Sequence, residues 1–438
     1  MNWFKNLINA FRIEETRNRI LFTIAMLAIF RLGCHIVCPG INISALLAYF
    51  ERLRGTLLGF YDIFTGGAFS RGTIFGLGVM PYISASIILQ VLSAVVPYFQ
   101  KLYREGEEGR RKITQYTRYG TILISAIQAT GVAIFFENAR SPEGIPVVPH
   151  PGARFVLLMV ITLVAGTMLL VWIGELITDR GIGNGISLII MFGIVARFPN
   201  DFLRTWQLIK AGAFSIFKIV FLILIVIGVT AAVVLITQAQ RRIPVQYAQR
   251  VIGRRIYGGR TTHLPLNMNA AGIIPIIFAQ SVLTFPATAL RFFSGNYTVQ
   301  RISEVFTPGH WFYNLLYVGL IIIFAYFYTS IVLNPQELAD YLQRYGGFIP
   351  GVRPGKYTAD YIDKVLSRIT LPGALFFAFV ALLPIILINK LGVPFYFGGT
   401  SLLIVVGVIL DTMRQLEAHL LMRHYEGFLR RGRIRGRR

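Results

Sequence analysis

The sequence of 438 residues predicts an all-α polytopic membrane protein, because 55% of its residues are hydrophobic and only 14% are charged. Its mean hydropathy of +0.61 excludes an ordinary soluble domain. Apolar runs long enough to cross the roughly 30 Å core of a bilayer as a helix occur ten times. They are residues 20–38, 73–97, 119–136, 155–174 and 182–198, then 216–237, 270–290, 313–333, 369–389 and 396–413. We therefore predict ten transmembrane helices, five in each half.

Short motifs repeat at the same ordinal positions of the two halves. Residues 78–81 in the second run read Gly-Val-Met-Pro, and residues 272–275 in the seventh run read Gly-Ile-Ile-Pro. Residues 186–190 in the fifth run and 400–404 in the tenth share a similar Ser-Leu-containing string. Corresponding interrupted segments in two halves indicate inverted repeats around a central pathway. The alternative is chance similarity among apolar helices.

Lysine and arginine are unequally divided between the two sides that ten spans define. Thirty of the 43 lie in the N-terminal segment, the C-terminal tail and the loops on the same side, whereas twelve lie opposite. Because the cytosolic side carries the excess of positive residues, both termini are predicted to be cytosolic. Topology therefore accounts for most of the net charge of +23.

This topology divides the chain into five parts with two long loops. The parts are a cytosolic N-terminal segment (1–19), an N-terminal half (20–198), an external hinge loop (199–215), a C-terminal half (216–413) and a basic cytosolic tail (414–438). The long cytosolic loops are expected at about 238–269 and 334–368.

Ionisable residues are scarce inside the predicted spans. Arg31 lies within the first span, whereas Glu175, Asp179 and Asp411 lie near span ends. An inverted-repeat secondary transporter, the main alternative, needs such groups at the bilayer midplane. An intramembrane protease or lipid-modifying enzyme needs a base beside its nucleophile. The chain also lacks a nucleotide-binding loop and a Cys/His cluster, so we expect no enzyme activity, no cofactor and no metal.

Aliphatic residues coincide when the repeats are superposed. The aligned pairs are Val79 with Ile273, Ile83 with Ile277, and Ile190 with Ile404. If the halves face each other, these side chains converge on one waist that excludes ions by dewetting and accepts varied cargo. Ordinary helix packing is the alternative.

A shorter apolar stretch, residues 55–69, precedes the second span and contains Asp62 and several glycines. It is too short to cross a bilayer comfortably. Because irregular backbone at membrane depth must lie inside protein or beside a cavity, the stretch is interpreted as a re-entrant plug. An extramembrane amphipathic helix is the alternative.

Uncharged polar residues occur in both members of the first repeated pair. They are Ser84, Ser86 and Gln90 in the second span, and Gln280, Ser281 and Thr284 in the seventh. Hydrogen bonds between such groups on neighbouring helices contribute about 0.6 kcal/mol each, a strength that permits sideways opening.

The loop after the sixth span is rich in arginine and contains no acidic residue. Its arginines are Arg241, Arg242, Arg250, Arg254, Arg255 and Arg260. Arginine binds phosphate in a bidentate manner and tyrosine stacks on bases, so an RNA-bearing or acidic partner could dock here. Topology alone is the alternative. Residues 430–438 are too charged to pack and are expected to form a disordered tail that binds anionic lipid or RNA.

Six strings in order along the chain are more specific than these patterns. They are residues 78–86 (GVMPYISAS), 109–112 (GRRK), 181–185 (GIGNG), 262–265 (THLP), 353–355 (RPG) and 394–401 (PFYFGGTS). Together they closely resemble the SecY family, the central subunits of bacterial protein-translocation channels. The resemblance runs from the first span through the tenth.

The resemblance implies two inverted five-helix halves around a central hourglass pore, with a side exit between the second and seventh spans. It implies a pore ring at Val79, Ile83, Ile190, Ile277 and Ile404. It implies a short plug helix at about residues 56–72, with Leu57, Leu58, Phe60, Ile63 and Phe64. The polar residues of the second and seventh spans would form the lateral gate.

The resemblance also implies partners and a function. Docking of the SecA motor or the ribosome is expected at Arg241, Arg242, Arg250, Arg254, Arg255 and Arg353. SecE and SecG are the expected small membrane subunits, and signal peptides and nascent chains the expected cargo. The chain would translocate unfolded secretory polypeptides across the bacterial plasma (inner) membrane and release membrane-protein helices sideways, driven by SecA or the ribosome.

Overall fold

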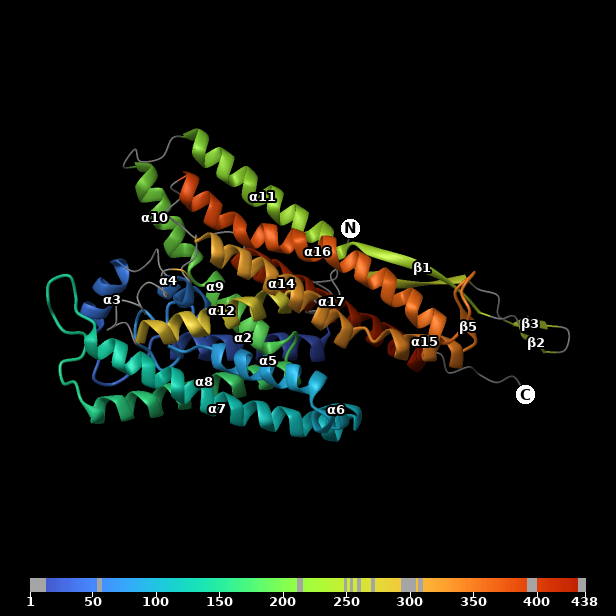
Figure 1. The fold of residues 1–438 in the computed structure, drawn as a ribbon, viewed down its shortest axis with the longest axis horizontal. Coiled ribbons are helices and arrows are strands. Elements are labelled where there is room, and N and C mark those ends of the chain that lie inside the picture. The colour runs from blue at the N-terminus through green and yellow to red at the C-terminus, as the bar shows by residue number, and fades with distance from the viewer. Residues whose placement is uncertain are drawn as a thin grey trace. The chain divides into compact units, whose positions relative to one another are not determined.

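The computed structural model describes residues 13–52, 57–210, 216–247, 250–252, 255–257, 261–268, 272–292, 305, 310–391 and 400–431. Most of them are helical (Figure 1). The helices are α2 (Glu14–Gly33), α3 (Ile43–Arg52), α4 (Leu57–Phe64), α5 (Met80–Val95), α6 (Pro97–Arg104), α7 (Glu107–Asn138), α8 (Ala153–Arg180), α9 (Gly185–Val195), α10 (Phe198–Lys210), α11 (Ile216–Gln238), α12 (Ile274–Phe292), α14 (Trp311–Val332), α15 (Pro335–Arg344), α16 (Lys356–Leu391) and α17 (Thr400–Arg431). The strands are β1 (Gln240–Tyr247), β2 (Arg250–Ile252), β3 (Arg255–Tyr257), β4 (Thr261–Asn267) and β5 (Gly347–Phe348).

Each of the ten predicted spans has a helix at its place, namely α2, α5, α7, α8, α9, α11, α12, α14, α16 and α17. Within the described residues, four stretches are long and apolar enough to cross a membrane by themselves: Glu107–Asn138, Ala153–Arg180, Trp311–Arg344 and Lys356–Leu383. Helix α5 and the start of α6, bent by 101°, make a fifth if they count as one span. The helices therefore agree with a multi-pass membrane protein.

The repeated Gly-x-x-Pro motif marks the start of a helix in both halves. Gly78 has φ +59° and Gly272 has φ +63°, a region that favours glycine. Two residues later α5 and α12 begin, each with proline as its second residue. Proline is tolerated there because N–H groups in the first turn have no acceptor within the helix. The second span was predicted from residue 73, but α5 begins only at Met80, because turns occupy residues 74–79.

The other repeated pair also marks helix starts. Helix α9 begins at Gly185, where the side chain of Asn184 accepts a hydrogen bond from the backbone N–H of Ser187. Helix α17 begins at Thr400. Ile190 and Ile404 thus lie in the second turn of their helices.

Contacts divide the chain into two compact units. The first contains residues 1–204, 284–307 and 408–438, and the second contains 205–283 and 308–407. In the first unit, helices α5, α7, α8 and α9 pack in succession. Glycines let their backbones approach closely: a Cβ on Gly185 would lie 1.9 Å from the carbonyl oxygen of Gly174.

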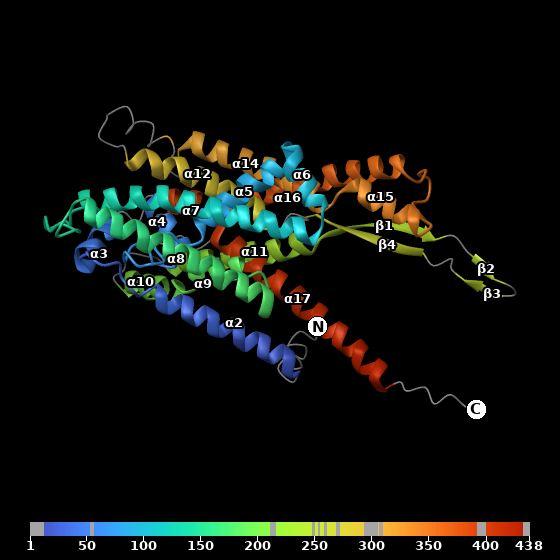
Figure 2. The same cartoon turned by 90° about the horizontal axis from the view of Figure 1, so that it is seen from below.

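The two long loops expected on the cytosolic side are not irregular, and the chain is therefore not purely helical. In the second unit, β1 pairs antiparallel with β4 (Figure 2) and also with β5. Side chains of β1 alternate between buried and exposed from Arg242 to Val245, a period-2 pattern typical of a strand. A core formed with α15 and α16 holds the sheet: Ile243, Val245, Leu266, Leu342, Ile349, Ile362 and Leu366.

Two further segments expected as loop or disordered tail contain helix. Helix α10 occupies most of the expected hinge loop at 199–215. Helix α17 continues to Arg431, so the first part of the tail, including Arg430 and Arg431, is helical. Packing explains part of this extension, because Leu416 is buried against Ile182 within the first unit.

Candidate functional site

The segment expected to be a plug is a short helix followed by turns. Helix α4 has eight residues and is about 12 Å long, too short to cross a bilayer. Turns follow from residue 65 to residue 79, interrupted by an isolated bridge between Thr73 and Val37. The side chains of Leu58, Phe64 and Phe69 are buried. This burial disfavours an extramembrane amphipathic helix and agrees with irregular backbone enclosed by protein.

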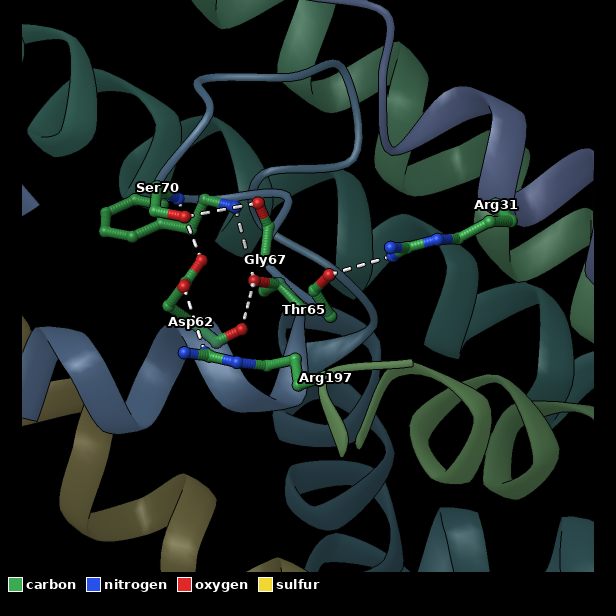
Figure 3. Close-up of polar contacts among 8 residues, drawn as sticks. Arg31, Asp62, Thr65, Gly67, Ser70 and Arg197 are labelled. Atoms are coloured by element: carbon green, nitrogen blue, oxygen red, sulfur yellow. Dashed lines mark hydrogen bonds and ion pairs between the residues drawn. The ribbon is translucent and has the colours of Figure 1, made fainter. Parts of the chain in front are cut away.

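An ion pair joins this segment to the end of α9 (Figure 3). Asp62 accepts a 3.0 Å hydrogen bond at Oδ2 from Arg197 Nη1. Its other oxygen, Oδ1, accepts a 2.8 Å bond from the backbone N–H of Ser70. The side chains are 7% exposed for Asp62 and 23% exposed for Arg197. A buried carboxylate needs such compensation, since desolvation of an unpaired charge is costly.

Hydrogen bonds within the segment fix the turn after α4. The main-chain carbonyl of Asp62 accepts from Thr65 Oγ1 at 3.1 Å and from the N–H of Gly67 at 3.0 Å. Thr65 Oγ1 accepts in turn from the N–H of Phe69 at 3.3 Å, and Ser70 Oγ donates to the Gly67 carbonyl at 3.3 Å. The free carbonyls at the end of α4 thus receive local donors.

Arg31, the cation inside the first predicted span, contacts the same segment. Its Nη1 donates a 3.1 Å hydrogen bond to the carbonyl oxygen of Gly66 (Figure 3). A charged side chain at this depth is costly unless it finds a partner. The structure therefore gives Arg31 a structural role: it joins α2 to the turn.

The turn and α9 meet through two glycines. Gly66 has φ +67°, and a Cβ built on it would lie 2.9 Å from the Cα of Gly193. A Cβ on Gly193 would lie 3.2 Å from the carbonyl oxygen of Phe64. The close approach of the two backbones thus depends on the absence of side chains at both positions.

A buried hydroxyl and aromatic rings hold the other side of the segment. Tyr61 donates a 2.8 Å hydrogen bond to the carbonyl of Leu77. Phe69 packs edge-on against Phe50 and Tyr61, with ring centroids 5.3 and 5.0 Å apart, and lies 5.7 Å from Phe136. The segment is consequently seated through a few polar contacts and one aromatic cluster.

The expected pore residues are buried and lie in both units. Val79, Ile83 and Ile190 belong to the first unit, and Ile277 and Ile404 to the second. Each follows a repeated helix start or lies beside it. In the second unit, a Cβ on Gly407 would lie 2.2 Å from a methyl carbon of Ile273, so the residue before α12 packs against α17. The ring of five residues stays a prediction.

The expected gate residues lie on α5 and α12. On α5, Ser84, Ser86 and Gln90 are half-buried, and Gln90 Nε2 donates to Ser86 Oγ at 3.0 Å. On α12, Gln280 and Ser281 are buried, and Gln280 hydrogen-bonds Tyr313. The side chain of Thr284 lies outside the described residues.

The expected docking arginines are described only in part. Arg241 and Arg242 are exposed on β1, and Arg353 is exposed just before α16. Arg254 lies outside the described residues, as do the side chains of Arg250 and Arg255. The same holds for Arg260 and for the side chains of the plug residues Leu57 and Phe60, whereas Ile63 is half-buried.

Sequence patterns did not identify Arg197 or Gly193 as partners of the segment expected to be a plug. Arg197 is 135 positions from Asp62 along the chain, and such pairing depends on tertiary packing. One signal was present, because a lone acid in a short apolar stretch needs a cation nearby.

Comparisons with known proteins identify the family. The sequence profile of the SecY family matches residues 73–413. The chain is 47% identical to the protein translocase subunit SecY of Aquifex aeolicus, over 96% of this chain and 98% of that protein. It is similar, with a TM-score of 0.64 and 20% identity over 92% of both chains, to a structure described as "The plug domain of the SecY protein stablizes the closed state of the translocation channel and maintains a membrane seal". It is also similar to Sec61 in the canine ribosome–channel complex from the endoplasmic reticulum, with a TM-score of 0.59 and 17% identity over 92% of both chains. The predicted channel fold is thereby confirmed, and the chain belongs to the SecY family.

Proposed function

We infer that this chain is the protein-conducting channel subunit of a translocase, a channel rather than an enzyme. Beside membership of the family, the inference is supported by the segment after α3, a short helix followed by turns. It is buried, and an ion pair with Arg197 and a close contact with Gly193 attach it to the end of α9. A similar protein is described as having a plug that stabilises a closed channel. Contacts of this kind suit a segment that closes an idle pore and leaves it when cargo arrives.

We propose that the plug closes on a ring formed by Val79, Ile83, Ile190, Ile277 and Ile404. All five side chains are aliphatic and buried. A ring of this chemistry excludes ions by dewetting and has no fixed ligand that would select one cargo. This supports unfolded secretory polypeptide as the cargo.

We propose further that Ser84, Ser86, Gln90, Gln280, Ser281 and Thr284 line a lateral gate. Signal peptides and membrane-protein helices would pass there into the bilayer. Hydrogen bonds among uncharged groups are weak, about 0.6 kcal/mol each, so the gate would open without breaking an ion pair.

Photocrosslinking from Ile190 and Ile404 tests the proposed path. The complete complex would be placed in vesicles with an arrested secretory precursor, SecA and ATP. We expect adducts with the precursor from both positions. Leu224, 66% exposed on α11, is the control and should give none. Translocation without adducts from Ile190 and Ile404 would mean that the cargo takes another route.

The proposed partners are membrane subunits and a cytosolic source of movement. We propose SecE and SecG as membrane subunits and the SecA ATPase or the ribosome as the source of movement, in the plasma (inner) membrane with cytosolic termini. The similar canine channel is described in a complex with a ribosome. Exposed Arg241 and Arg242 on β1 and Arg353 suit phosphate or carboxylate groups of such a partner. We further propose that the basic tail binds anionic lipid, and that the chain needs no cofactor or metal.

Reversing the charge of Arg353 should weaken docking of the partner without affecting folding of the channel. Arg353→Glu is expected to reduce motor-driven export about tenfold or more, since a charge-assisted contact contributes about 1.5–3 kcal/mol. Arg353 is exposed, so the amount of membrane-inserted protein should not change. Initial export rates in vesicles measure the effect.

Arg140→Glu supplies the matched control. Arg140 is also exposed, and the charge distribution predicts that it lies on the opposite side of the membrane. Its reversal should leave export unchanged. Equal export by both variants and the unaltered chain would remove Arg353 from the docking surface.

A further inference from the structure

Helix α10 carries an exposed apolar face that no channel role explains. Phe202, Leu203 and Trp206 are 70%, 56% and 51% exposed. Phe202 and Trp206 are four residues apart and therefore share one helix face, with Leu203 beside them. On another side of the helix, Asn200 is exposed, two residues before Phe202 and six before Trp206. The helix is thus amphipathic, and its apolar side chains Phe202, Leu203 and Trp206 are exposed instead of packed in the protein's own core.

The length of α10 excludes a transmembrane orientation. Its 13 residues span about 20 Å, shorter than the roughly 30 Å core of a bilayer. It also contains Asp201 and Arg204, which would be costly at the centre of the bilayer. A short helix with one apolar and one polar face lies in the plane of the interface instead.

The neighbours of α10 in the chain are the helices α9 and α11. Two residues separate it from α9, and five separate it from α11. Both of these helices correspond to predicted spans. Helix α11 exposes Phe217 at 87% and Leu224 at 66%, as expected of a helix that faces lipid. The apolar face of α10 and the apolar surface of α11 are therefore neighbours along the chain.

The polar groups beside this face suit lipid headgroups. Lys210 Nζ lies 5.7 Å from the centroid of the Trp206 ring, a cation–π contact. Tryptophan is enriched where the acyl chains meet the headgroups, and lysine next to it can extend toward headgroup phosphate. The same helix thus presents an apolar anchor and a cation at adjacent positions.

We propose that α10 is a membrane-interface anchor whose Phe202, Leu203 and Trp206 insert into the lipid at the level of the headgroups and upper acyl chains. The partner is the lipid surface itself, and the phosphate of the headgroup is the group that Lys210 approaches. The anchor would hold the connection between the two halves of the chain at a fixed depth.

Fluorescence quenching of Trp206 tests this proposal. The complete complex, with Trp3, Trp172 and Trp311 changed to Phe, would be reconstituted in phosphatidylcholine vesicles containing lipids brominated at a shallow or a deep acyl position. We expect the shallow label to quench Trp206 at least about twofold more strongly than the deep label. A chain with tryptophan only in place of Ile227, 64% exposed in the middle of α11, is the depth control and should show the reverse order.

Two charge variants establish whether the apolar face is responsible. Phe202→Glu should reduce lipid quenching of Trp206 and increase its quenching by aqueous acrylamide about twofold. Asn200→Glu adds the same charge away from the face, at an exposed position, and should change neither. Quenching by acrylamide but not by brominated lipid would place the face in water, and protection from both quenchers would place it under another protein; either outcome overturns the proposal.

Discussion

Replacing Gly66 with alanine is expected to raise the ion conductance of the idle complex by more than tenfold. A non-glycine residue in the left-handed region costs roughly 1–2 kcal/mol. The new methyl group would also lie 2.9 Å from the Cα of Gly193, so the turn or α9 must move. Because 1.4 kcal/mol is a factor of about ten, the seated plug would lose more than tenfold in population. Conductance of vesicles without cargo measures the loss.

Variants of Gly67 and Gly193 distinguish backbone strain from steric contact as the cause of the leak. Gly67 has φ +84° but open space around its Cβ position, so Gly67→Ala adds backbone strain without a steric contact. Gly193→Ala adds only the contact, 3.2 Å from the carbonyl oxygen of Phe64. We expect the Gly66 variant to leak more than either. If all three conduct no more than the unaltered complex, the plug is not seated through this contact.

Breaking the ion pair between Asp62 and Arg197 should also raise the ion conductance of the idle complex. The two single variants are expected to differ in how much they raise it. Arg197→Gln leaves the buried carboxylate of Asp62 uncompensated, whereas Asp62→Asn leaves the more exposed guanidinium of Arg197. An unsatisfied buried polar group costs about 1–3 kcal/mol, and more for a charged one. We therefore expect conductance to rise about tenfold or more in the Arg197 variant and less in the Asp62 variant.

The double variant reveals the coupling. With Asp62→Asn and Arg197→Gln together, no charge is left unpaired, so the free-energy change should be smaller than the sum of the single changes. Arg71→Gln removes a cation from the same segment and serves as the control. Strictly additive effects, or an equal leak in the Arg71 variant, would contradict a specific pair that holds the plug.

The positions of the helices followed from the sequence because burial in lipid demands continuous apolar runs. Ten such runs have ten helices at their places, and the repeated motifs mark where helices begin. Local chemistry decides these features: glycine permits a positive φ, and proline is tolerated in a first helical turn. The β-sheet formed by β1, β4 and β5 was missed, because its core is completed only by α15 and α16.

The sequence alone predicts a ten-span membrane protein of two related halves, with Asp62 in a short plug-like stretch. The residues that hold this stretch became known from the folded structure. Arg31 on α2, and Gly193 and Arg197 in and just after α9, are far from the segment in the sequence, yet each lies within a few ångströms of it. Composition and periodicity report what a residue needs, such as a partner for a buried charge. Which residue supplies it depends on how helices pack, a non-local property that periodicity does not encode.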